Sequence, residues 1–204
     1  GTHVRTGKNF VVSNNEGIGW GATYQHDGAN ALQHPSTSSV RNTSVEVLEH
    51  ISNIYHDRLE LITDSAGAGR FRGGVGIRRD VSFIADSEII SMKKKTKTSG
   101  WGLNGGRADS KNKMIIWPGT DKEKHVGMYR TFMKKGETFQ NYSAGGGGWG
   151  NPYAREIERI IDDIKNGYIS IESAEKDYGL IVKDDYTYEE NEERLEYTKK
   201  NINE

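Results

Sequence analysis

Four consecutive glycines open the stretch Gly145-Gly146-Gly147-Gly148-Trp149-Gly150-Asn151-Pro152, which leads into an amphipathic helical pattern. Glycine loses more conformational freedom on ordering than any other residue, so such a run indicates positive φ angles or very close backbone approach. In one interpretation the amides of Gly146, Gly147 and Gly148 cradle an anion ahead of the helix. In the other, which we favour, the run is a tight crossing between a sheet and the helices.

Nucleotide-binding motifs are absent from the sequence around this run. No Lys-Ser or Lys-Thr pair follows the glycines, and no strand–Gly-x-Gly-x-x-Gly–helix unit surrounds them. We therefore do not expect this run to bind ATP by itself.

Apolar residues recur at helical spacing after the glycines, at Ile157, Ile160, Ile161 and Ile164. This stripe predicts an amphipathic helix over 154–165, which Gly167 ends. Ser170 is a good N-cap for a second short helix, which Gly179 ends. Beyond Lys183 the chain is acidic, and we expect a frayed helix or a mobile tail.

Strand-like alternation and short apolar runs fill the middle of the chain, at 58–63, 81–92, 114–117, 128–133 and 138–142. A short helix is expected over 44–51, where Thr43 or Ser44 can cap it. The predicted fold class is α+β: mainly antiparallel β with glycine-rich turns, arranged as a β meander and closed by two short C-terminal helices. We expect one β-rich domain over 1–183 and an acidic tail over 184–204.

Composition limits the classes of function. The 28 basic and 29 acidic residues give a net charge of −1, which predicts no general attraction to nucleic acid or to an anionic membrane. The absence of cysteine excludes disulfides, thiolate-bound zinc and a thiol nucleophile. No apolar run has the length of a membrane span and no secretion signal is visible, so we expect a cytoplasmic protein. The hydrophobic content of 33% predicts a thin core that a partner's surface could complete.

Candidate binding residues lie in the glycine-rich segments. None of the six histidines has a metal-binding spacing, so we expect no metal site from this chain alone. Arg70 and Arg72 flank Phe71 and could bind a carboxylate or phosphate, or could simply pair with acids of the sheet. His26-Asp27 and His34 could converge on a ligand, or could form an exposed loop. The basic segment 93–97 is expected to be a solvated edge, with contact to a phosphate or an acidic partner as the alternative.

Seven motifs in order resemble the C-terminal part of the hydantoinase B/oxoprolinase family, which includes the B-type subunits of ATP-dependent hydantoinases and of acetone or acetophenone carboxylases. They are GWGA at 19–22, QHP at 33–35, RNTSVEVLE at 41–49, DSAGAGRFRGGVG at 64–76, WGLNGGR at 101–107, GGGGWGNP at 145–152 and DIKNGYIS at 163–170. The resemblance spans about residues 17–182.

This resemblance implies an assembly in which an A-type subunit binds ATP and Mg and phosphorylates a substrate carbonyl, while the B-type subunit completes amide hydrolysis or carboxylation. It implies two partners, the A-type subunit and an upstream B-type segment; any divalent metal would lie in that upstream segment. The site residues that it suggests in this chain are His34, Arg41, Asn42, Arg70 and Arg72. The lead hypothesis is an amidohydrolase acting on a small-molecule cyclic amide; the alternatives are a related carboxylase and a non-catalytic scaffold.

Overall fold

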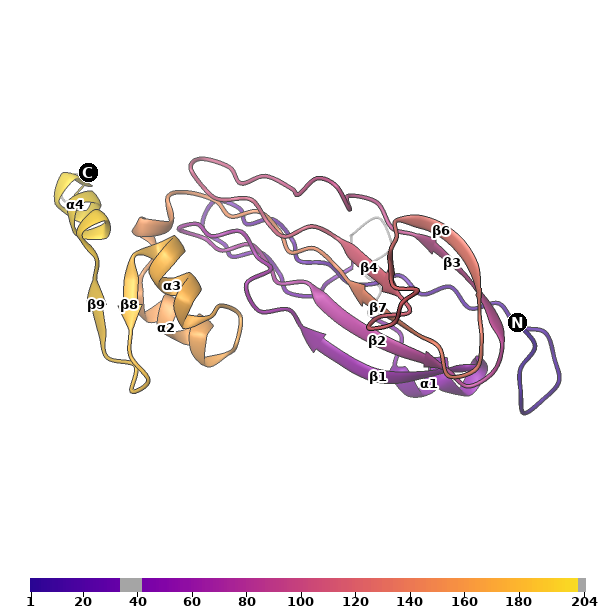
Figure 1. The fold of residues 1–204 in the computed structure, drawn as a ribbon. Helices are drawn as coiled ribbons and strands as arrows, with labels where there is room; N and C mark the ends of the chain where they lie inside the picture. The colour runs from indigo at the N-terminus through magenta and orange to yellow at the C-terminus, as the bar shows by residue number, and fades with distance from the viewer. Residues whose placement is uncertain (34–41, 202–204) are drawn as a thin grey trace.

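The computed structural model of the chain describes residues 1–33 and 42–201. In chain order its elements are α1 (Val45–Ile51), β1 (Ile54–Leu61), β2 (Ile77–Phe83), β3 (Ser87–Met92), β4 (Lys113–Ile116), β5 (Lys124–His125), β6 (Met128–Met133), β7 (Thr138–Tyr142), the 3-10 helix η2 (Pro152–Ala154), α2 (Ile157–Lys165), α3 (Ile171–Tyr178), β8 (Leu180–Val182), β9 (Tyr188–Glu190) and α4 (Glu192–Asn201). Figure 1 shows an elongated molecule, with α2–α4 at one end, most strands at the other, and extended chain between. None of the described helices is long and apolar enough to cross a membrane.

All strand pairs are antiparallel, and they form a five-stranded sheet of order β1-β2-β7-β4-β5 and two two-stranded sheets, β3-β6 and β8-β9. The α+β class with mainly antiparallel sheets is confirmed, but the predicted meander is wrong. The turn that follows β6 is hydrogen bonded to the end of β2, where the Gly136 amide donates to the Phe83 carbonyl at 2.7 Å. This turn directs β7 along β2 instead of back along β6.

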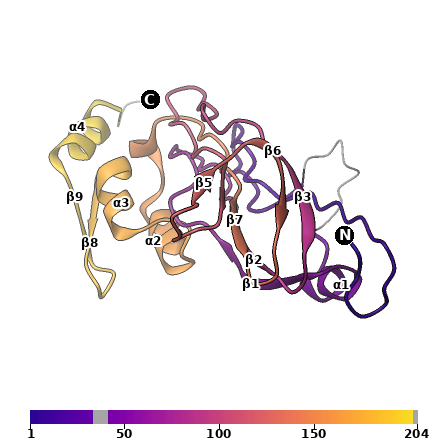
Figure 2. The same cartoon turned by 45° about the vertical axis from the view of Figure 1, so that its right-hand side comes forward.

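The segment 81–92, expected to be one strand, is divided between two sheets. β2 ends at Phe83 and β3 begins at Ser87. The Ile84 amide still donates to the Asn53 carbonyl at 2.9 Å, in register with the β1–β2 pairing, and the chain leaves the first sheet after that residue. Figure 2 shows the resulting β3-β6 sheet beside the five-stranded sheet.

Extended segments that belong to no named strand form a glycine-rich bundle between the sheets and the helices (Figure 1). We define this bundle by its segments 17–22, 28–31, 65–76, 101–110 and 144–150. Single backbone hydrogen bonds join segments that lie far apart in sequence. The Gly146 amide donates to the Gly74 carbonyl, the Gly67 amide donates to the Gly146 carbonyl, and the Ala22 amide donates to the Gly147 carbonyl. The last segment therefore lies in the middle of the bundle.

Each of the four consecutive glycines faces the carbonyl of a neighbouring segment. A Cβ atom added at residues 145, 146, 147 or 148 would lie, in turn, 2.1, 1.8, 2.0 and 2.1 Å from the carbonyl oxygens of Ser65, Trp20, Trp101 and Ala68. Real Cβ contacts are never so short. The run is glycine because backbone surrounds it on several sides, which is the close-approach interpretation.

The two helices predicted after the bundle are present. α2 begins at Ile157 rather than 154, because η2 occupies residues 152–154, and it ends before Gly167, whose φ is +70°. Ser170 caps α3 by accepting from the Ser173 amide at 3.0 Å, and Gly179 ends that helix with a φ of +67°. Their apolar faces form one core together with the connecting residue Ile169 and strand β8, and this core reaches Ala68 of the bundle. Its other members are Ile160, Ile161, Ala174, Tyr178, Leu180 and Val182.

The remaining expectations differ in detail. α1 matches the helix predicted over 44–51, but Ser44 makes no side-chain capping bond. Where a frayed helix or a mobile tail was expected, the structure has β9 and α4. The Arg194 side chain anchors α4, since it is 4% exposed and donates to the carbonyls of Tyr178 at 2.9 Å and Arg155 at 2.7 Å.

The geometry of the bundle predicts different effects on stability for two glycine-to-alanine changes. Gly146→Ala places a methyl group against the Trp20 carbonyl and should lower the free energy of unfolding by about 3 kcal/mol or more. Gly21→Ala is the matched control, because its Cβ would meet only the Gly147 carbonyl, at 3.9 Å. The control should change stability by no more than about 1 kcal/mol. Chemical denaturation of both variants measures this, and equal stabilities would contradict the bundle geometry.

Candidate functional site

Two of the five predicted site residues, His34 and Arg41, lie outside the described residues. A third, Asn42, accepts a hydrogen bond from the Gly17 amide at 3.0 Å. It lines a small open cavity of about 170 Å³, together with Leu59 and Ile77. Neither Arg70 nor Arg72 lines that cavity. The structure therefore does not place Asn42 in one pocket with the two arginines.

Arg72 belongs to a buried network of two arginines and two aspartates, which we call the Arg–Asp network: Asp27, Arg72, Arg155 and Asp163. Arg155 is 1% exposed and binds both Asp27 oxygens, at 2.8 and 2.9 Å. Asp163 accepts from Arg155 at 2.7 Å and from Arg72 at 3.1 Å. The Arg72 guanidinium also contacts Asn30 and the ring of Tyr168. The two positive and two negative formal charges of the Arg–Asp network cancel, and buried ionic groups need such pairing because an unpaired buried charge is costly.

The Arg–Asp network joins the bundle to the helical end of the molecule. Asp27 and Arg72 come from the bundle side, whereas Arg155 follows η2 and Asp163 lies in the last turns of α2. Burial alone would raise the pKa of Asp27, but the hydrogen bonds and charge of Arg155, with the Arg72 amide, outweigh it and hold this pKa below its ordinary value. The carboxylate therefore stays ionised at neutral pH. Of the predicted pair His26-Asp27, only the exposed His26 is outside this network.

Arg70 is exposed and lies in a second group, the aromatic–arginine cluster, which consists of Tyr24, Arg70, Phe71, Trp149 and Arg159. The Arg70 and Arg159 guanidinium carbons are each 5.8 Å from the centre of the Phe71 ring. Trp149 packs against Phe71 at 5.9 Å and against Tyr24 at 5.2 Å, between ring centroids. Exposed guanidinium groups held over aromatic rings suit a carboxylate, a phosphate or a planar group.

The predicted anion-binding amides lie inside the bundle. The amides of Gly146 and Gly148 donate to the carbonyls of Gly74 and Arg107 at 2.9 and 3.0 Å, so both are already engaged within the chain. The carbonyl of Gly147 accepts from Ala22 at 2.8 Å.

A buried polar group that the sequence analysis missed lies on the inner face of the five-stranded sheet. We call it the Arg79 cluster: Glu16, Glu49, His56, Arg79 and Lys93. Arg79 is 2% exposed, and its Nε lies 2.7 Å from a Glu16 oxygen although the N–H is not directed along that line. Its Nη1 lies 2.7 Å from His56 Nε2. A signal was present, because Arg79 alternates with Ile77 and Val81 and so falls on the buried face of β2.

The hydrogen-bond partners of His56 determine which of its ring nitrogens carries the proton. Arginine can only donate, so His56 Nε2 accepts from Arg79 and the proton lies on Nδ1, 3.3 Å from Glu49. Burial, and then the charge of Arg79, lower the pKa of His56, which keeps the ring neutral at pH 7. Burial also lowers the pKa of Lys93 to about 8, with the Glu16 carboxylate offsetting part of this effect. The Lys93 ammonium donates to the Tyr142 carbonyl at 2.9 Å.

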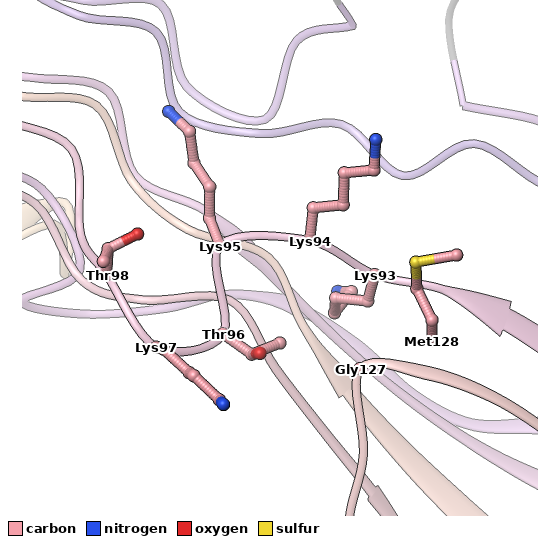
Figure 3. Close-up of a pocket in the computed structure, with 8 residues that line it drawn as sticks. All are labelled: Lys93, Lys94, Lys95, Thr96, Lys97, Thr98, Gly127 and Met128. Atoms are coloured by element: carbon pink, nitrogen blue, oxygen red, sulfur yellow. The ribbon is translucent and has the colours of Figure 1, made fainter.

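The basic segment 93–97 lines an open cavity of about 450 Å³ with Thr98, Gly127 and Met128. Figure 3 shows that its lysines do not converge: Lys94 and Lys95 extend to one side, Lys97 extends to the other, and Lys93 lies apart from them. The cavity thus has a basic rim but no single point where several cations meet.

The described part of the chain contains no candidate metal-binding site. In residues 1–33 and 42–201, no three His, Asp or Glu side chains are grouped closely enough to hold an ion.

The sequence of this chain is similar to proteins of a known family. Residues 1–152 match the model of the hydantoinase B/oxoprolinase family. The chain is 29% identical over 192 residues to a putative B-type subunit of a D-/L-hydantoinase from Pseudomonas sp. (strain NS671), and the match covers 89% of this chain and 30% of the relative. It is 31% identical over 152 residues to the beta subunit of the caprolactamase of Pseudomonas jessenii, covering 68% of this chain and 25% of the relative.

The acetone carboxylase alpha subunit of Xanthobacter autotrophicus is 26% identical over 204 residues, with 81% of this chain and 26% of the relative covered. Two solved structures share the fold. The nucleotide-free structure of an ATP-dependent acetone carboxylase has a TM-score of 0.73 at 21% identity, over 91% of this chain and 29% of that one. The ATP-dependent caprolactamase from P. jessenii has a TM-score of 0.71 at 26% identity, over 83% and 31%. The chain spans between a quarter and a third of the length of these proteins.

The lowered pKa of Lys93 predicts that the free energy of unfolding depends on pH. Its folded pKa of about 8 lies below the ordinary 10.5, so the unfolded chain holds more protons between these values, and stability rises with pH in that window. Lys93→Met removes the effect and serves as the reference. The free energy of unfolding of the wild type minus that of Lys93→Met should be flat below pH 7 and increase by about 2 kcal/mol from pH 8 to pH 10. Urea denaturation at four pH values measures this; a difference that does not vary with pH would show that Lys93 is solvated.

Proposed function

We propose that this chain, which belongs to the hydantoinase B/oxoprolinase family, acts as the C-terminal portion of the B-type subunit of an ATP-dependent amidohydrolase. Its substrate would be a small cyclic amide such as a hydantoin or a lactam. The observation that carries the proposal is the family match over residues 1–152, combined with coverage of only 25–31% of the compared proteins.

Amide hydrolysis is preferred over carboxylation on the strength of the relatives. The hydantoinase and caprolactamase subunits, whose names denote cyclic amides, are 29% and 31% identical to this chain, against 26% for the acetone carboxylase subunit. A related ATP-dependent carboxylase is the second candidate. A non-catalytic scaffold is the third, and it is favoured by the burial of Arg72 in the Arg–Asp network.

ATP and Mg would be bound by an A-type partner in this proposal. The ATP dependence of the proposed complex is supported by the two structures that share the fold, which are described as an ATP-dependent acetone carboxylase and an ATP-dependent caprolactamase. Any divalent metal would lie in the upstream part of the B-type subunit. A cytoplasmic location follows from the same proposal, since ATP is the co-substrate.

The aromatic–arginine cluster is the surface through which this chain would contribute to the shared site. Arg70 is the one predicted catalytic residue in the described part of the chain whose guanidinium group is exposed, and the ring of Phe71 holds it in place. Guanidinium groups stabilise carboxylates and phosphates with paired hydrogen bonds. A phosphorylated amide carbonyl, or the carboxylate that hydrolysis releases, would meet that requirement.

Reconstitution tests the proposed function. The chain is combined with an upstream B-type segment and an A-type subunit, and ADP release is measured with hydantoin, a lactam, and acetone plus bicarbonate. ADP release that needs all three polypeptides and a cyclic amide is the expected result. Release with acetone and bicarbonate alone would favour the carboxylase, and the absence of turnover with every substrate would favour the scaffold.

Arg70→Ala should lower turnover of the reconstituted complex by about a hundredfold, the low end of the effect of removing one hydrogen-bond donor to a reacting group. Arg58→Ala is the matched control, because Arg58 is an exposed arginine on β1. Both variants should melt within about 2 °C of the wild type, as surface substitutions do. Equal turnover of Arg70→Ala and Arg58→Ala would remove Arg70 from the site.

A further inference from the structure

Four large apolar side chains stand exposed on one face of the β3-β6 sheet. They are Ile90, Met92, Met128 and Phe132, with exposed fractions of 62, 78, 71 and 71%. Strand pairing makes them a continuous row of neighbours on the same face, because Met92 lies opposite Met128, Ile90 lies diagonal to Met128, and Phe132 lies diagonal to Ile90. We call this surface the β3-β6 outer face. Its other two members, Glu88 and Arg130, form an ion pair with each other.

The opposite face of the same sheet is packed on the protein. Ile89 and Tyr129 contact the core formed by Met114, Ile116 and Val126. The sheet is therefore fixed in place and presents its outer face in one geometry. A strand pair with one buried face normally carries polar residues on the other, so an apolar outer face is typical of an interface.

The charges of this surface indicate the chemistry of what covers it. Glu88 and Arg130 neutralise each other, so the centre of the face carries no net charge. Met128 also lines the cavity whose rim is formed by Lys94, Lys95 and Lys97 (Figure 3). A complementary partner would offer an apolar patch bordered by acidic residues.

The compared proteins supply an occupant of sufficient size. This chain spans 25–31% of their length, so at least two thirds of each lies outside the shared region. Covering a sheet face of this kind inside one subunit would also complete the thin core expected from a hydrophobic content of 33%.

We propose that the β3-β6 outer face is covered by the upstream segment of the B-type subunit, through an apolar patch with an acidic border. This inference rests on the proposed function and adds to it the surface by which the two parts of the subunit meet. The aromatic–arginine cluster is a separate surface on the bundle, so the two can be tested independently.

The test measures binding of the separately expressed upstream B-type segment to this chain by calorimetry. The double variant Ile90→Lys/Phe132→Lys should weaken binding at least tenfold without lowering the melting temperature, because both side chains are exposed. The control Ile181→Lys/Tyr188→Lys alters exposed residues of the β8-β9 sheet at the other end of the molecule (Figure 1) and should change binding less than twofold. Hydrogen exchange of the wild-type complex should show new protection over 87–92 and 128–133.

Three outcomes would overturn the inference in distinguishable ways. Wild-type binding that the Ile90→Lys/Phe132→Lys variant retains, with protection elsewhere, would reject this face while leaving the proposed function intact. Failure of the wild type to bind the upstream segment would reject both. A homodimer of the wild-type chain, seen by sedimentation and broken by the double variant, would assign the face to a second copy. Should the double variant misfold, the exchange pattern of the wild-type complex decides.

Discussion

Backbone-to-backbone contact around residues 145–148 is the constraint on which the rest of the structure depends. In most folds side chains fill the space between elements, whereas here the carbonyls of Ser65, Trp20, Trp101 and Ala68 occupy the positions that Cβ atoms would need. This contact sets the spacing between the segments, since a residue can lie that close to a neighbouring carbonyl only where it has no Cβ atom. The lean hydrophobic content becomes understandable, because the bundle is held by main-chain hydrogen bonds rather than by a large apolar core.

The Arg–Asp network follows from the same constraint. The glycine-rich bundle offers little apolar surface for helices to pack on, and of its described residues Ala68 alone belongs to the helical core. Asp27 and Arg72 supply the additional attachment by pairing with Arg155 and Asp163 beside α2. A buried ionic set of this kind adds little net stability but is strict about geometry, because every charge must be matched. The Arg–Asp network therefore fixes the orientation of the helical end relative to the bundle. It thereby also fixes the position of the neighbouring aromatic–arginine cluster.

Local signals in the sequence predicted local structure well. The isoleucine spacing, Ser170 and Gly179 identified α2 and α3 because helix periodicity and capping act within a few residues. Pairing between distant strands could not be read in the same way, so the order β2-β7-β4 and the separate β3-β6 sheet were missed. Arg72 was expected either to bind a ligand or to pair with acids of the sheet, but its partner Asp163 lies 91 residues away in α2, which no local signal marks. The Arg79 cluster left a signal in the alternation of β2, but its partner Glu16 comes from an irregular segment that no periodicity marks.

The order in which the bundle segments are synthesised has a consequence for folding. The central segment 144–150 is the last of the five to leave the ribosome, and its hydrogen bonds complete a bundle whose earlier segments also bond to one another. Until then, segments 17–22 and 65–76 carry few apolar side chains with which to collapse, and closing loops of this length costs entropy that only the complete contact repays. We therefore expect the bundle to be complete only after translation has passed residue 150, and a nascent chain stalled before that point would lack its central segment.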